Sequence, residues 1–225
     1  MGWVVAGTLS ALALFGAATG AWAQVSPGSA PVPAAGRQDL SFVTHASFFS
    51  QETHRTPAID PQVFVRDNAG LGGVGPQNID HVAGIRPARL DDSGWNVAYN
   101  AHAESLQFTL AKWFGATGSA DIAPQGAGNR VTLAFDKLIP FGVYSVFRVT
   151  FSPAGTTFNP LDGDGTSDSF TAGADGGGKI VIDTATPLDH GEAILLVYHS
   201  DSQNHGSSRG TIGVNAHHQL IARLP

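Results

Sequence analysis

A stretch near the C-terminus gathers side chains that bind metal ions or transfer protons. The segment YHSDSQNHG contributes two histidines and an aspartate, and NAHHQL adds two more histidines shortly after it. Neutral imidazole is the commonest transition-metal ligand in proteins, and a carboxylate can complete the set, so this composition predicts a zinc or copper site. The alternative is a polar loop whose side chains satisfy the backbone by hydrogen bonding. The candidate ligands are His199, Asp201, His205, His217 and His218.

The elements on either side of this stretch decide whether the ligands meet. The apolar runs AILLVY and HQLIARL are typical of strands. A hairpin between them would bring His199 close to His217 or His218, with Asp201 and His205 on the loop above. Because adjacent strand residues point to opposite faces, we expect only one of His217 and His218 to join the group.

A second candidate site lies in the segment LDGDGTSDSF, where oxygen-bearing side chains alternate. Calcium binds six to eight hard oxygens, and the spacing begins like an EF-hand loop. The segment then departs from that motif, with Ser167 in place of the glycine at position six and Gly173 in place of the glutamate at position twelve. A calcium site in a β loop and a plain Asp/Gly turn both remain open. The candidate calcium ligands are Asp162, Asp164, Thr166 and Asp168.

Two further motifs resemble catalytic ones without their context. GSSRG matches G-x-S-x-G with Ser208 as the nucleophile, but no helix pattern follows and no Asp or Glu occurs after Ser208, which disfavours hydrolase chemistry. GADGGGK nearly matches a phosphate-binding loop, but Ile180 stands where Ser or Thr is needed and KIVID is typical of a strand. We expect its DGGG to form a hairpin turn.

The elements that position these loops are predicted to be strands. WNVAYNA, LQFTLAKW, RVTLAFDKL and VYSVFRVTF alternate apolar residues with others, as half-buried strands do, and KIVIDT, AILLVY and HQLIARL follow. Roughly seven or eight short strands predict an all-β fold, an antiparallel β-sandwich of Ig-like or jelly-roll-like type. The alternation also predicts that Trp95 and Trp113 point inward.

One of these segments is ambiguous. AESLQFTLAKWFG also repeats apolar residues at helical spacing, through Leu106, Leu110 and Trp113. We favour a strand because Phe108 and Thr109 are poor helix formers and the neighbouring segments are strands.

The chain divides into four predicted segments. Residues 1–23 carry no charge and end in AWA, which predicts a secretory signal peptide cleaved after Ala23. No Lys or Arg precedes the apolar run, so an uncleaved membrane anchor is the alternative. Residues 24–38 form a Pro/Ala/Ser linker, 39–94 an irregular N-terminal extension docked as a layer, and 95–225 the β-sandwich domain.

Composition narrows the function classes. The 225 residues include no cysteine, which excludes thiolate zinc sites, iron–sulfur clusters, blue-copper ligation and thiol nucleophiles. Charged residues make up 13% of the chain, against roughly 25% in typical domains, and the net charge is −6. Without clustered Lys and Arg we expect no nucleic-acid partner. Beyond the signal we expect no membrane span, and we predict a secreted or periplasmic protein.

Three functions remain open from the sequence. The first is an exported, non-enzymatic binding or structural module whose His/Asp-rich loop binds a divalent metal or an envelope or extracellular partner. The second is a secreted copper- or zinc-dependent metalloenzyme with an open coordination position. The third is a self-assembling cell-envelope protein, favoured by low charge, high glycine content and any unpaired edge strand.

Overall fold

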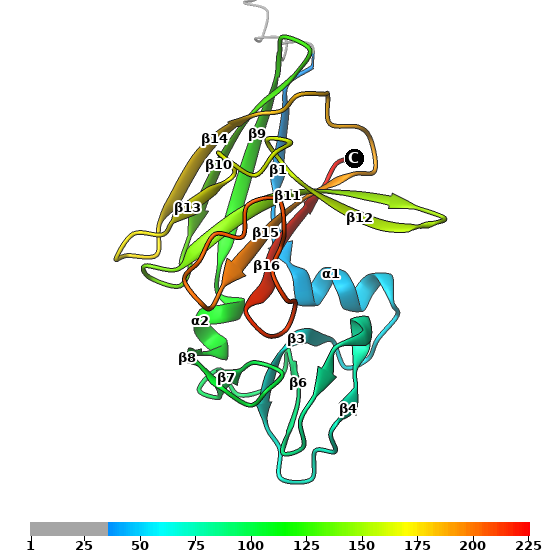
Figure 1. The fold of residues 1–225 in the computed structure, drawn as a ribbon, viewed down its shortest axis with the longest axis vertical. Helices are drawn as coiled ribbons and strands as arrows, with labels where there is room; N and C mark the ends of the chain where they lie inside the picture. Colours follow the sequence, from blue (N-terminus) through cyan, green and yellow to red (C-terminus); the bar gives the residue numbers. More distant parts are fainter. Residues whose placement is uncertain (1–35) are drawn as a thin grey trace, which may run out of the picture. The chain divides into compact units, whose positions relative to one another are not determined.

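The computed structural model describes residues 36–225 (Figure 1). The predicted signal peptide and residues 24–35 of the predicted linker lie outside the described residues. Among the described helices, none is long and apolar enough to cross a membrane.

Two antiparallel sheets form a sandwich, as the alternation predicts. One has the strand order β1-β9-β10-β14, and the other has the order β12-β11-β15-β16-β2, with β13 also paired to β11. The first sheet consists of β1 (Gln38–Ser41), β9 (Thr117–Gln125), β10 (Gly128–Asp136) and β14 (Gly178–Asp183). The second consists of β12 (Gly155–Pro160), β11 (Val143–Ser152), β15 (Ala193–His199), β16 (Ala216–Arg223), β2 (Val43–Thr44) and β13 (Ser169–Thr171). The all-β antiparallel prediction is therefore confirmed.

The main hydrophobic core lies between these two sheets. Strand β10 shows how the sequence produces it: Val131, Leu133 and Phe135 are buried while the residues between them are exposed or half-buried. They join Val146 of β11 and Leu196 of β15 in one cluster of buried side chains. Burying the alternate residues of both sheets supplies the main stabilisation of a chain that has no disulfide.

Strand β15 is buried on both of its faces. Every residue from Ala193 to His199 is buried, because the far side of the second sheet is covered as well. A second core cluster there contains Leu195 and Val197, and Phe48 of helix α1 (His45–Glu52) packs against it. This double burial explains why the sequence AILLVY is continuously apolar rather than alternating.

A third sheet joins residues from both sides of position 95. Its order is β6-β3-β7-β8, and Phe64 of β3 pairs with Tyr99 of β7. Its strands are β6 (Ile85–Arg89), β3 (Ile59–Arg66), β7 (Val97–Tyr99) and β8 (Ser105–Thr109). The remaining elements are the two-stranded pair β4 (Gly73–Val74) and β5 (Asp80–His81), the 3₁₀ turn η1 (Pro76–Asn78) and helix α2 (Leu110–Phe114).

Two local predictions near residue 100 need correction. Trp95 is 88% exposed and Val97 is 41% exposed, whereas Ala98 between them is buried, so the inward-facing set is the opposite one. Strand β7 spans only three residues, which is too short for the alternation to determine its face. The ambiguous segment is a strand up to Thr109 and a helix from Leu110, so favouring a strand throughout was wrong.

A buried aspartate ties helix α2 to the third sheet. Trp113, which is buried as expected, donates from its indole Nε1 to the Oδ2 of Asp60 at 2.8 Å. The backbone N–H groups of Gln62 and Val63 donate to Oδ1 of the same carboxylate at 2.9 and 3.1 Å. These bonds lie where β3 shifts its register against β6, between Asp60 and Phe64. Asp60 thus satisfies backbone groups that the irregular strand leaves without ladder partners.

Candidate metal site

The predicted hairpin between β15 and β16 exists and places His199 at the mouth of a long loop. The two strands pair antiparallel, with His199 opposite Ala216. His199 is the last residue of β15, and the loop that follows carries Asp201 and His205. The end of a rigid, doubly buried strand therefore fixes one ligand, and the loop brings the other two back over it.

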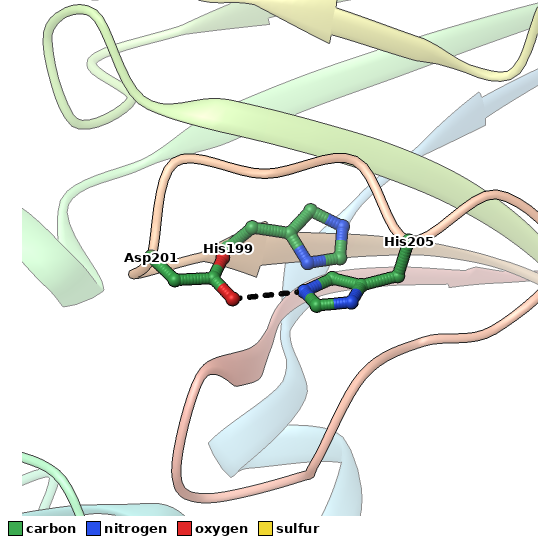
Figure 2. A group of neighbouring side chains, drawn as sticks. All are labelled: His199, Asp201 and His205. Atoms are coloured by element: carbon green, nitrogen blue, oxygen red, sulfur yellow. Dashed lines mark hydrogen bonds and ion pairs between the residues drawn. The ribbon is translucent and has the colours of Figure 1, made fainter.

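Three side chains of this region converge on one point. Their possible ligand atoms, an imidazole nitrogen each from His199 and His205 and a carboxylate oxygen from Asp201, all lie within 4.8 Å of one another. Nε2 of His205 is 3.0 Å from Oδ2 of Asp201, and the two imidazole rings have centroids 5.1 Å apart. Figure 2 shows the ring of His199 lying over that of His205, next to the Asp201 carboxylate. This group can hold a metal ion.

The hydrogen bonding of His199 identifies its ligand atom. Its Nε2 is 2.6 Å from the Oγ of Ser145 on β11. Its Nδ1 is buried and has no hydrogen-bond partner among the described residues. Figure 2 shows one nitrogen of this ring turned toward the Asp201–His205 pair, and Nδ1 is the nitrogen not engaged with Ser145. With a metal on Nδ1, the Nε2–H donates to the serine hydroxyl.

Burial keeps His199 in the form that binds metal. Burial, and next the charge of His205, lower the pKa of His199 to about 4. The imidazole is therefore neutral across the physiological range, with a free lone pair on the nitrogen that carries no proton.

The carboxylate of Asp201 is oriented by a second side chain. The Nδ2 of Asn215 donates to its Oδ2 at 2.9 Å, and the backbone N–H of Thr211 donates to the Oδ1 of Asn215 at 2.7 Å. The side chains of Asp201 and His205 are 26% and 22% exposed, so the group opens to solvent on their side. A metal ion can enter there without unfolding the strand end.

Sequence reasoning missed the two residues that orient the ligands, Ser145 and Asn215. Ser145 lies 54 positions before His199 and meets it only because β11 and β15 are neighbours in the sheet. One signal was present: Ser145 is the polar member of the otherwise apolar alternating set in VYSVFRVTF, and it is completely buried. A buried hydroxyl needs a partner, and a buried imidazole provides it.

The two adjacent histidines of β16 lie outside the group. They point to opposite faces, as predicted. His217 is buried against Trp113 and Tyr198, with its Nδ1 3.1 Å from the carbonyl oxygen of Gln62.

His218 lies on the opposite face of the sheet from His217, next to helix α1 and away from the metal group. Its ring meets that of His45 edge-on at 4.8 Å, and Arg209 donates to its Nε2 at 3.0 Å. The expectation that one of the pair would join His199 is therefore not met in this structure. The β15–β16 register places both rings beside other partners.

The candidate calcium loop touches the loop of the metal group. Gly165 has a φ of +78°, and a Cβ on it would overlap the backbone of Gly206. The Nδ2 of Asn204 also donates to the Oγ of Ser169 at 2.8 Å. The loop's aspartates do not converge as closely as the His199 group does, and the Thr166 hydroxyl donates to Oδ1 of Asp164 at 2.7 Å.

The two motifs without catalytic context have local structural roles. Ser208 accepts a hydrogen bond from the backbone N–H of Gly210 at 3.1 Å, and no helix follows it. Asp175 accepts from Gly177 at 2.8 Å in a turn that leads into β14 rather than into a helix. DGGG does form a turn, but it connects β13 of the second sheet to β14 of the first, and these strands do not pair, so the hairpin prediction is wrong.

Removing the Ser145 hydroxyl is expected to weaken metal binding without removing a ligand. Ser145→Ala leaves Nε2 of His199 without its partner, so the ring loses the bond that fixes its orientation. Outer hydrogen-bond partners of this kind typically contribute about 10–100-fold in metal affinity. A chelator competition titration with zinc measures the change, and an affinity equal to that of the unmodified chain would show that Ser145 does not orient His199.

Acid is expected to destabilise the fold partly through His45 and His218. Burial, and next the charge of Arg209, lower the pKa of His45 to about 3, and burial lowers that of His218 well below its ordinary value. Below pH 6.5 the unfolded chain takes up protons that these folded imidazoles do not, so their stabilising contribution is lost as pH falls. Asp60, whose pKa burial raises to about 6, acts in the opposite direction.

The contribution of one imidazole can be isolated with His45→Phe. Between pH 6 and pH 4 the unfolding free energy of this variant should depend on pH less steeply, by up to about 1.4 kcal/mol per pH unit, the limit for a difference of one proton. Urea unfolding at several pH values measures it. Equal slopes for the variant and the unmodified chain would mean that His45 is protonated in the folded state.

A cavity of about 870 Å³ adjoins the metal group. Asp201 and Asn215 border it, together with Tyr198, Phe141 and Glu104. Of the three candidate ligands Asp201 lines it, so the carboxylate side of the group borders a space large enough for a small molecule or a partner side chain. No family model matches the chain, and no curated protein or solved structure is significantly similar to it.

Proposed function

We propose that this protein is an exported, non-enzymatic β-sandwich module that binds one divalent transition-metal ion through His199, Asp201 and His205. The observation that carries the proposal is the convergence of three ligand atoms within 4.8 Å, one of them a buried imidazole nitrogen with no other partner among the described residues. Export is supported by the uncharged, apolar N-terminal segment that ends in AWA.

The donor set favours Zn²⁺ or Cu²⁺. Two imidazoles and a carboxylate suit these ions, whereas Cu⁺ prefers thiolate and thioether sulfur, and Ca²⁺ and Mg²⁺ prefer oxygen alone. Three protein ligands leave a fourth position for water or for a side chain of a partner. Ser145 and Asn215 supply the outer hydrogen bonds that hold metal-ligating side chains in place.

Elemental analysis tests the proposal. The chain, purified without a polyhistidine tag and desalted, is expected to retain close to one equivalent of zinc or copper. A His199→Ala/His205→Ala variant should retain none, whereas His102→Ala/His190→Ala, which removes two exposed histidines, should keep the metal. Equal metal content in both variants, or none in the unmodified chain after incubation with zinc, would refute the site.

A second function, a metalloenzyme, is favoured by the cavity beside Asp201. Catalytic zinc sites have three protein ligands and an exchangeable water, and this group supplies three. Substitution with Co²⁺ tests the requirement of the enzyme for an open coordination position. A visible spectrum that is unchanged when azide is added would rule out the metalloenzyme, whereas a shift would show an exchangeable position, which the enzyme requires and the binding module also allows.

A further inference from the structure

Asp168 is a buried carboxylate that the protein leaves without a partner. It lies between β12 and β13, at the end of the loop formed by residues 161–168, and it has no exposed surface. Neither of its carboxylate oxygens accepts a hydrogen bond from another residue among those described. An unpaired ionised carboxylate is costly to bury, so it requires a proton or a cation.

The surroundings of Asp168 are negative. Burial, and next the charges of Asp162 and Asp164, raise the pKa of Asp168 to about 7. Three carboxylates therefore lie within seven residues of the chain, and no Lys or Arg among the described residues forms an ion pair with any of them.

Asp162 shapes the loop around its own side chain. The backbone N–H groups of Gly165, Thr166 and Ser167 donate to its two oxygens at 2.7, 2.9 and 2.6 Å. Burial acts to raise the pKa of Asp162, but the bonds from the N–H groups of Ser167 and Gly165, and next from the Ser167 hydroxyl, together lower it. Asp162 is thus held ionised by backbone donors, and the loop is curled before any ion arrives.

The free oxygens of the loop belong to the other two aspartates. Asp164 uses Oδ1 to accept from the backbone and hydroxyl of Thr166, at 3.0 and 2.7 Å. Its Oδ2 and both oxygens of Asp168 accept no hydrogen bond from another described residue. Carboxylate and carbonyl oxygens without nitrogen or sulfur donors are the ligands of a hard cation.

We propose that residues 162–168 form a calcium site, with Asp168 and Asp164 as carboxylate ligands in a loop shaped by Asp162. Backbone carbonyls and water complete the six to eight oxygens that calcium takes. Calcium fits better than magnesium because an irregular loop supplies variable geometry, whereas magnesium demands a near-ideal octahedron. The site is separate from the His199 group, but Gly165 contacts Gly206, so calcium would also order the loop that carries His205.

Calcium titration of the full chain tests this proposal, with thermal unfolding and calorimetry as readouts. The unmodified chain should bind one calcium ion and its Tm should rise saturably, with a Kd near or below the roughly 10⁻⁴–10⁻³ M of extracellular modules. Asp168→Asn should lose this response. Without calcium the variant should be at least as stable as the unmodified chain, because the amide has the same shape and no charge. Asp136→Asn, at an exposed position on β10, is the matched control and should respond normally.

Three results would overturn the calcium site. One is no saturable response of the unmodified chain at about 10 mM calcium, well above the weakest usual Kd. Another is an unchanged response in Asp168→Asn. The third is a Tm of calcium-free Asp168→Asn that lies well below the Tm of the unmodified chain, which would mean that Asp168 stabilises the fold without calcium. The His199→Ala/His205→Ala variant should keep its calcium response, so the two sites are tested independently.

Discussion

Replacing His205 with alanine is expected to weaken zinc binding by at least about 100-fold, the upper end of what loss of an outer hydrogen-bond partner costs. His205 supplies one of the two imidazoles, through the Nε2 that now lies 3.0 Å from Asp201. Without it the ion keeps one imidazole and one carboxylate, too few protein ligands for a tetrahedral site. Competition with a chromophoric zinc chelator at neutral pH measures the affinity.

The fold should tolerate this change, so the loss of affinity reports on the site itself. The side chain of His205 is 22% exposed and lies on a loop rather than in the core. Circular dichroism and Tm without metal are expected to match those of the unmodified chain. His102→Ala, at an exposed position, is the matched control and should leave zinc affinity unchanged. An unchanged affinity in His205→Ala would place any bound zinc elsewhere.

Replacing Asp60 with alanine is expected to destabilise the fold by about 3 kcal/mol or more, because three buried donors each lose a partner at about 1–3 kcal/mol. The donors are the indole Nε1 of Trp113 and the backbone N–H groups of Gln62 and Val63. The two backbone groups lie at the irregular part of β3, where no ladder bond can replace the carboxylate, and the indole reaches it from helix α2. Urea unfolding at pH 7 measures the change in free energy.

Two variants separate the parts of this effect. Trp113→Phe leaves both backbone donors paired, but it removes the indole donor together with ring volume from the core, so its cost combines one lost hydrogen bond with a cavity. Asp60→Asn keeps an acceptor for the two backbone groups and should lie between the unmodified chain and Asp60→Ala. A loss below about 0.5 kcal/mol in Asp60→Ala, the size of an ordinary surface substitution, would contradict this role.

The sandwich was predictable because its signal is local. Alternation in RVTLAFDKL predicts a strand with one buried face, and β10 has that face. The apolar run AILLVY predicts a strand, and β15 is that strand; its burial on both faces is seen only in the structure. Where an element is shorter than the pattern that would identify it, the prediction fails. Strand β7 has only three residues, and it buries Ala98 instead of the alternate positions Trp95 and Val97.

The candidate metal ligands could be predicted in part from the sequence, but the side chains that orient them could not. His199, Asp201 and His205 lie within seven residues, so composition alone drew attention to them. The placement of His217 and His218 depends on what lies beyond the hairpin: the Gln62 carbonyl on one face, and His45 with Arg209 on the other. Ser145 and Asn215 act through sheet neighbours and loop closure, which a linear sequence does not display.

The most direct test of the metal site is anomalous diffraction at the zinc absorption edge, from crystals grown with zinc. The account predicts one strong peak about 2.0–2.1 Å from Nδ1 of His199 and Nε2 of His205, and about 2.0–2.2 Å from a carboxylate oxygen of Asp201. A map with no peak there, or with peaks only at exposed histidines such as His102, would contradict it. In that case His199, Asp201 and His205 would be loop-stabilising residues and not metal ligands.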